Sequence, residues 1–133
     1  MTFGSPIVNI SSPWPAGSTP TYTCQIVDPY GVGIPASAFS SLTLSIVDTL
    51  SGAIINGASQ VNILNTGRGM IDSSGNLTIV LETGDTSMSE APGQAQIQRS
   101  LVIDWTYATT GSQPSFGTSR HQVNFILLAL AGP

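Results

Sequence analysis

Few side chains of this 133-residue chain could carry out chemistry. His121 is its only histidine, Cys24 is its only cysteine, and it contains no lysine. A phosphate-binding P-loop, a pyridoxal Schiff base and a serine–lysine dyad each need a lysine, so the sequence excludes all three. One histidine and one cysteine are also too few for a zinc site of the usual kind. We therefore expect neither a metal site nor a cofactor site.

A serine–histidine–aspartate triad around His121 is the first catalytic arrangement to weigh, because serines and aspartates are plentiful. The Gly-x-Ser-x-Gly turn that presents the nucleophile in many hydrolases is absent from the sequence. His121 instead follows Arg120 at the start of an alternating apolar pattern. A histidine at the beginning of a strand is the favoured interpretation.

Paired carboxylates are the second arrangement, since two of them at a suitable separation can hydrolyse a glycosidic bond. Glu82, Asp85 and Glu90 lie close together in the sequence. Asp85 has a structural explanation, because an aspartate there can cap the first turn of a short helix. The run Asp72–Asn76 lacks the further ligands of a calcium loop and is better explained as a turn. We predict no catalytic residue and no enzyme activity.

The surface around these residues must be poor in charge. Only 8% of the residues are charged and the net charge is −4, whereas about 25% is usual in soluble domains. Three scattered arginines do not make the basic stripe that nucleic-acid binding needs. The longest apolar run, Phe125–Ala131, is too short to span a bilayer. We expect no nucleic acid and no membrane as partner, and a surface that other protein subunits cover.

Alternation of apolar and polar residues predicts strands along most of the chain. A one- or two-turn helix is predicted over Gly84–Glu90, where Ser87 and Glu90 also have the spacing of a capping box. The stretch Gly57–Met70 is expected to be a loop with one short strand. Six to eight strands and at most one short helix indicate an all-β fold, a β-sandwich of the immunoglobulin-like or jelly-roll type. The clearest predicted strands are Thr21–Val27, Ser41–Asp48, Leu77–Glu82, Ile97–Tyr107 and His121–Leu128. Ala53–Asn56 is a candidate return strand that would form a hairpin with Ser41–Asp48.

Residues 1–20 are rich in Pro, Ser, Gly and Thr and are predicted to form an extended arm, followed by a single β-sandwich domain over residues 21–133. The arm lacks the basic and long apolar segments of a signal peptide, so we expect no export by that route. Its apolar side chains need a surface, either on their own domain or on a neighbouring subunit. The candidate partner-binding residues are Phe3, Ile7, Ile10 and Trp14.

Trp105 and Tyr107 share the apolar phase of their strand with Leu101 and Ile103, which favours packing in the core over stacking on sugars. Trp14 lies between two prolines, outside any alternating pattern. A tryptophan in such a place can anchor the arm in a groove of a partner, and docking on its own domain is an equal alternative.

Several segments of the chain resemble small virion proteins of tailed bacteriophages. The resemblance covers most of the chain after Thr21 and consists of a strand that ends in Asp-x-x-Gly-x-x-Ile-Pro at Asp28–Pro35, a Leu-Thr-Leu strand from Leu42 and an Ile-Ile-Asn-Gly segment that ends at Gly57. Asp72–Thr78, Gly84–Thr86 and His121–Phe125 also fit it.

This resemblance implies a β-sandwich subunit of a phage particle that is assembled in the host cytoplasm. Within that class we favour a capsid decoration or cement protein on the head surface, bound to the major capsid protein and associating with further copies of itself. A head–tail connector or a tail or baseplate subunit is the alternative. A carbohydrate- or receptor-binding module on the virion surface is a second alternative.

Overall fold

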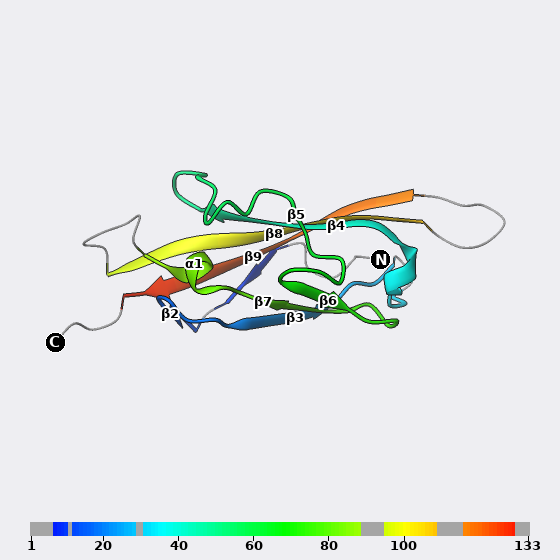
Figure 1. Ribbon diagram of the computed structural model, residues 1–133, viewed down its shortest axis with the longest axis horizontal. Coiled ribbons are helices and arrows are strands. Elements are labelled where there is room, and N and C mark those ends of the chain that lie inside the picture. The colour runs from blue at the N-terminus through cyan, green and yellow to red at the C-terminus, as the bar shows by residue number, and fades with distance from the viewer. Residues whose placement is uncertain (1–6, 11, 29–30, 89–94, 109–115, 130–133) are drawn as a thin grey trace.

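Two β-sheets stacked face to face make up the protein (Figure 1). The structure is a computed structural model that describes residues 7–10, 12–28, 31–88, 95–108 and 116–129. Its elements are β1 (Ile7–Asn9), β2 (Trp14–Pro15), β3 (Thr21–Gln25), the 3-10 turn η1 (Ala36–Ala38), β4 (Phe39–Asp48), β5 (Val61–Asn62), β6 (Gly69–Ile71), β7 (Asn76–Val80), α1 (Thr83–Thr86), β8 (Gln96–Ala108) and β9 (Phe116–Leu128).

The larger sheet has the strand order β1-β9-β8-β4-β5, and β2 pairs with β9 as well. Its centre is the antiparallel hairpin of β8 and β9, two strands of 13 residues each that pair from Gln96↔Leu128 to Ala108↔Phe116. The smaller sheet has the order β3-β7-β6, with both pairings antiparallel. The long alternating patterns of the sequence therefore form the middle of the larger sheet.

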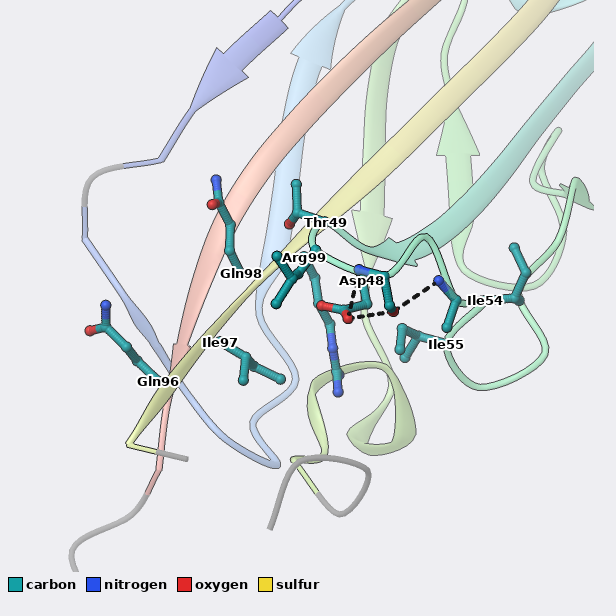
Figure 2. A pocket seen from close by; sticks show the side chains of 11 residues that line it. Asp48, Thr49, Ile54, Ile55, Gln96, Ile97, Gln98 and Arg99 are labelled. Atoms are coloured by element: carbon teal, nitrogen blue, oxygen red, sulfur yellow. Dashed lines mark hydrogen bonds between the residues drawn. The ribbon is translucent and has the colours of Figure 1, made fainter. Parts of the chain in front are cut away.

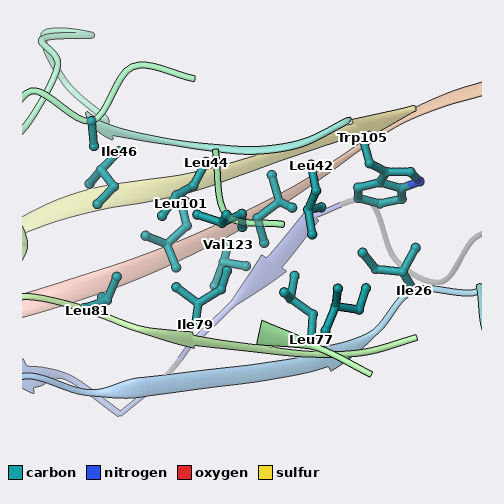
Figure 3. Packing of buried hydrophobic residues seen from close by; sticks show 14 of the residues in the cluster. Ile26, Leu42, Leu44, Ile46, Leu77, Ile79, Leu81, Leu101, Trp105 and Val123 are labelled. Carbon is teal, nitrogen blue, oxygen red and sulfur yellow. The ribbon is translucent and has the colours of Figure 1, made fainter. Parts of the chain in front are cut away.

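The hydrophobic core lies between the two sheets (Figure 3). Leu42, Leu44 and Ile46 point inward from β4, and Leu77 and Ile79 face them from β7, all with 0% exposure. Because side chains alternate across a strand, the residues between them face outward. Burying each such side chain contributes about 1.5–3 kcal/mol, so this alternation accounts for much of the drive to fold.

The predicted all-β fold is confirmed. The described residues form nine strands rather than six to eight, because short strands such as β2 and β5, of two residues each, are too short to show alternation. The candidate return strand Ala53–Asn56 is present only as an isolated antiparallel bridge between Val47 and Ile54, with hydrogen bonds from Asp48 N to Ala53 O and from Ile55 N to Ile46 O at 2.9 Å. The strands that pair with β4 are β8 and β5.

The predicted helix is also shorter than expected. α1 has four residues, and its capping box is formed by Glu82 and Asp85, not by Ser87 and Glu90. Asp85 lies in the first turn, where its side chain accepts a hydrogen bond from the backbone N–H of Glu82 at 2.8 Å. Glu90 lies outside the described residues.

The described part of residues 1–20 lies along the edge of the larger sheet. β1 and β2 pair in parallel with β9, with Ile7 beside Gln122 and Trp14 beside Leu127. Proline removes a backbone donor and is tolerated at a sheet edge, which explains Pro15 in β2. The arm was expected to lie either on its own domain or on a neighbouring subunit. Its described residues lie on their own domain.

Candidate interaction surface

Of the four residues predicted to bind a partner, the structure places the side chains of Ile10 and Trp14. Both are partly buried against the core. The Trp14 ring lies 4.6 Å from that of Phe125 in a tilted arrangement. Phe3 and the side chain of Ile7 lie outside the described part of the chain. The indole of Trp14 is thus occupied by its own domain, and a partner surface has to be sought elsewhere.

The histidine and the cysteine come close to the same tyrosine between the two sheets. Tyr22 Oη and His121 Nε2 are 2.8 Å apart, and both Tyr22 and Cys24 point inward from β3. Burial raises the pKa of Cys24 to about 11 and that of Tyr22 to about 12. Both groups are therefore protonated at neutral pH, and neither is a ready nucleophile. Sequence spacing could not reveal this group, because Tyr22 and His121 belong to different sheets.

Asp85, one of the three weighed carboxylates, is completely buried and makes a dense set of hydrogen bonds. Arg68 donates to both of its oxygens, at 2.7 and 2.9 Å, and Asn56 Nδ2 donates at 3.0 Å. Burial raises the pKa of Asp85, but the hydrogen bonds from Arg68, Asn56 and the Glu82 amide outweigh that effect and hold the pKa below its ordinary value. A carboxylate held in this way is a structural centre rather than a general acid or base.

Two arginines hold α1 between the sheets. Arg99 from β8 donates to the backbone oxygens of Asp85 and Ser87 at 2.8 and 2.6 Å, and Arg68 reaches Asp85 from the residue before β6. The third arginine, Arg120, forms an ion pair with Asp104 at 2.7 Å. All three arginines of the chain thus donate to acceptors within the chain.

Stability is expected to fall as the solution becomes more acidic than about pH 4. The folded pKa of Asp85 lies below its ordinary value of 3.8, so its ionised form stabilises the protein above that pH. This contribution disappears as pH falls through the folded pKa. Urea midpoints measured from pH 7 to 3 should decline less steeply for Asp85→Asn than for the unmodified protein. Asp48 and Asp72, whose pKa is lowered by hydrogen bonds from Ser51 and Asn76, account for the remaining decline. Equal slopes in both proteins would contradict this assignment.

A fully exposed leucine marks the turn after β4. Leu50 is 96% exposed and Ile54, four residues on, is 46% exposed. The turn between them is held by the Asp48 carboxylate, which accepts hydrogen bonds from Ser51 Oγ at 2.6 Å and Ser51 N at 3.3 Å. A backbone bond from Gly52 N to Asp48 O at 2.7 Å closes it. The turn therefore presents Leu50 in a defined position.

A groove of about 600 Å³ lies beside this turn (Figure 2). Ile54 and Ile55 line it from the turn, and Ile97 and Arg99 line it from the start of β8. Its volume is within the range of about 300–1,000 Å³ that binding clefts have. We call Leu50, Ile54 and this groove the apolar turn surface. Sequence reasoning missed it, although a leucine directly before Ser51-Gly52 was a visible signal.

Around Asn124, the outer face of the larger sheet carries neutral groups that bond to one another, and the ion pair of Asp104 and Arg120 lies farther along the same face. Asn124 Oδ1 accepts from Ser100 Oγ at 2.6 Å and from Gln122 Nε2 at 3.0 Å. Asn124 Nδ2 donates to Asn9 Oδ1 at 2.9 Å, which also ties β1 to β9. Covering such a face costs less desolvation free energy than covering charges.

The described residues contain no group of three or more His, Cys, Asp or Glu side chains that could hold a metal ion. No helix among them is long and apolar enough to cross a membrane. Comparisons with protein-family models, curated proteins and solved structures find no match to the chain.

Proposed function

We propose that this chain is a non-enzymatic structural subunit of a virus particle that binds neighbouring subunits, most specifically a decoration protein on a shell of major capsid protein. The observation that carries the proposal is the apolar turn surface. Leu50 is 96% exposed, yet the hydrogen bonds of Asp48 hold its turn in place. A leucine presented in this way loses little conformational entropy when a partner covers it.

Two further features support a role in contact rather than catalysis. The outer face of the larger sheet offers neutral, mutually bonded side chains around Asn124, and only 8% of all residues are charged. Two of the weighed reactive groups, Asp85 and His121, have structural partners in Arg68 and Tyr22. The location on a capsid follows the resemblance to small phage virion proteins.

Two aromatic residues weigh against the carbohydrate-binding alternative. Trp105 and Tyr107 are only 4% and 5% exposed, in agreement with their predicted place in the core. Sugar recognition by stacking needs aromatic rings that are open to solvent, and these two rings are buried.

Replacing Leu50 with serine is expected to weaken binding to the shell about 10–30-fold, because truncating an interface anchor costs about 2 kcal/mol. Stability should change by less than about 0.5 kcal/mol, since the side chain is exposed in the free protein. The chain would be co-expressed with the major capsid protein of its particle, and the bound chain would be quantified after shells are sedimented.

Val32→Ser is the matched control, because Val32 is 61% exposed in a turn before β4, whereas Leu50 follows the other end of that strand. The control should bind like the unmodified chain. If the unmodified chain stays in the supernatant at a saturating concentration of shells, the proposed function is wrong.

A further inference from the structure

The strand β3 forms one edge of the smaller sheet. Two backbone hydrogen bonds, one at each end of β3, show which of its residues bond to β7 and which face away from it. Leu81 N donates to Pro20 O and Ile26 N donates to Gly75 O, both at 2.9 Å. Bonding residues alternate along an antiparallel strand, so even-numbered residues of β3 bond to β7. The N–H and C=O groups that point away from β7 are those of Thr21, Thr23 and Gln25.

No backbone hydrogen bond from another described residue reaches this outer side of β3. Natural proteins protect such edges with charged side chains, prolines or bulges. The sequence of β3, Thr-Tyr-Thr-Cys-Gln, contains none of these, and its five residues pair with β7 without a bulge. The edge is therefore ready to accept another strand.

The edges that β1, β2, β5 and β6 form in the described part of the chain are short or covered. β1 and β2 have three and two residues, and β5 has two. On β6, Asn65 Oδ1 already accepts from Ile71 N at 2.8 Å, and a Cβ placed on Gly69 would lie only 2.3 Å from the carbonyl oxygen of Ile63. On β9, Phe116–His121 extend past β1 with no described strand on their outer side, but this stretch contains the charged Arg120. Among the described strands at a sheet edge, β3 is thus the one that is open along its whole length and has no charged side chain.

We propose that β3 pairs antiparallel with β3 of a second copy of this chain, about a two-fold axis that passes through Thr23. Thr23 then bonds to Thr23 of the second copy, and Thr21 bonds to Gln25 of the second copy. Each of these pairs exchanges two backbone hydrogen bonds. The two three-stranded sheets become one continuous sheet across the axis.

A second copy fits this edge because the edge is complementary to itself. Strand pairing about a two-fold axis places the residue on the axis opposite its own symmetry mate, so a charged residue at the centre would face its own charge. Thr23 at that centre is neutral, and threonines directly opposite each other form a favourable cross-strand pair. This contact between copies extends the proposed role in contacts between subunits, but the capsid protein takes no part in it.

The test is disulfide formation in the purified full chain, in a Cys24→Ser background. In the proposed register the two Thr23 Cα atoms are about 5.5 Å apart, within the roughly 4.4–6.8 Å that a disulfide spans. Thr23→Cys should therefore form a covalent dimer under mild oxidation. Thr21→Cys alone should not, because its symmetry mate is about four residues away along the strand, or roughly 14 Å. Thr21→Cys combined with Gln25→Cys should restore the covalent dimer.

A second measurement uses the non-covalent dimer, in case the cysteine variants fold poorly. Sedimentation equilibrium should show a dimer whose dissociation constant rises at least tenfold in Thr23→Lys. Thr78→Lys should leave it unchanged, because Thr78 is opposite Thr23 in the sheet but lies on the central strand β7. A monomer at several hundred micromolar would overturn the proposal, and so would equal cross-linking of Thr21→Cys and Thr23→Cys. These measurements contain no shell protein, so they do not test the proposed binding to the capsid. That binding is tested separately by co-sedimentation with shells.

Discussion

Replacing Asp85 with alanine is expected to lower the free energy of unfolding by about 3–5 kcal/mol, the usual effect of removing one partner of a buried ion pair. Asp85 has no exposed surface, and the side chain of Arg68 is only 12% exposed. The substitution leaves the guanidinium of Arg68 without the carboxylate that takes its two shortest hydrogen bonds, at 2.7 and 2.9 Å. It also removes the acceptor of the Glu82 amide and of Asn56. Urea unfolding followed by circular dichroism measures this loss.

Glu82→Gln is the matched control for this prediction. Glu82 also pairs with Arg68, at 3.2 Å, but its side chain is 59% exposed. Exposed ion pairs contribute at most about 1 kcal/mol, so this variant should stay close to the unmodified protein. If Asp85→Ala lost no more stability than Glu82→Gln, Asp85 would not be the centre that holds α1 between the sheets.

Trp14→Ala is expected to cost about 3 kcal/mol, the lower end of the range for removing a buried aromatic side chain, because Trp14 is only partly buried. The ring packs on Phe125, a core residue of β9. The backbone of Trp14, in β2, pairs with that of Leu127 in β9. Without it, the segment before β3 should detach and become accessible to protease. Urea unfolding and limited proteolysis at a fixed enzyme ratio measure both effects.

Two substitutions separate packing from other effects at this position. Trp14→Phe keeps an aromatic ring against Phe125 and should recover most of the loss. Pro13→Ala changes an exposed neighbour and should have an effect below about 0.5 kcal/mol. If Trp14→Ala instead kept full stability and lost only its binding to shells, Trp14 would be a partner anchor, the other role that the sequence allowed.

The parts of the fold that could be predicted from the sequence are those where burial repeats along one strand. In β4 and β8 the apolar residues alternate over many positions, because one face meets the core and the other does not. Asp72–Asn76 was also predictable as a turn, since the Asp72 side chain accepts from the amides of Ser74 and Asn76. β2 and β5 are too short for any pattern, and they form strands because a longer neighbour offers them hydrogen bonds.

The candidate sites were harder to predict, because they depend on residues that are distant in sequence. Asp85 was expected to cap a helix, but nothing local indicated that Arg68, 17 positions earlier, and Arg99, 14 positions later, would converge on its turn. Tyr22 and His121 meet across 99 positions. For Leu50, its place directly before Ser51-Gly52 was a local signal, but its exposure depends on the rest of the fold, in which no described element covers it.

The pairing of β1 with β9 has a consequence for synthesis on the ribosome. Asn9 and Asn124, which bond across these strands, are 115 positions apart, so β1 emerges from the ribosome well before β9. At about 5–20 residues per second, the N-terminal segment waits for several seconds before its partner strand exists. Contacts of such long range also make folding slow, because much chain entropy is lost before they form. A nascent chain therefore carries Trp14 without its final packing partner until Phe125 has been made and has emerged.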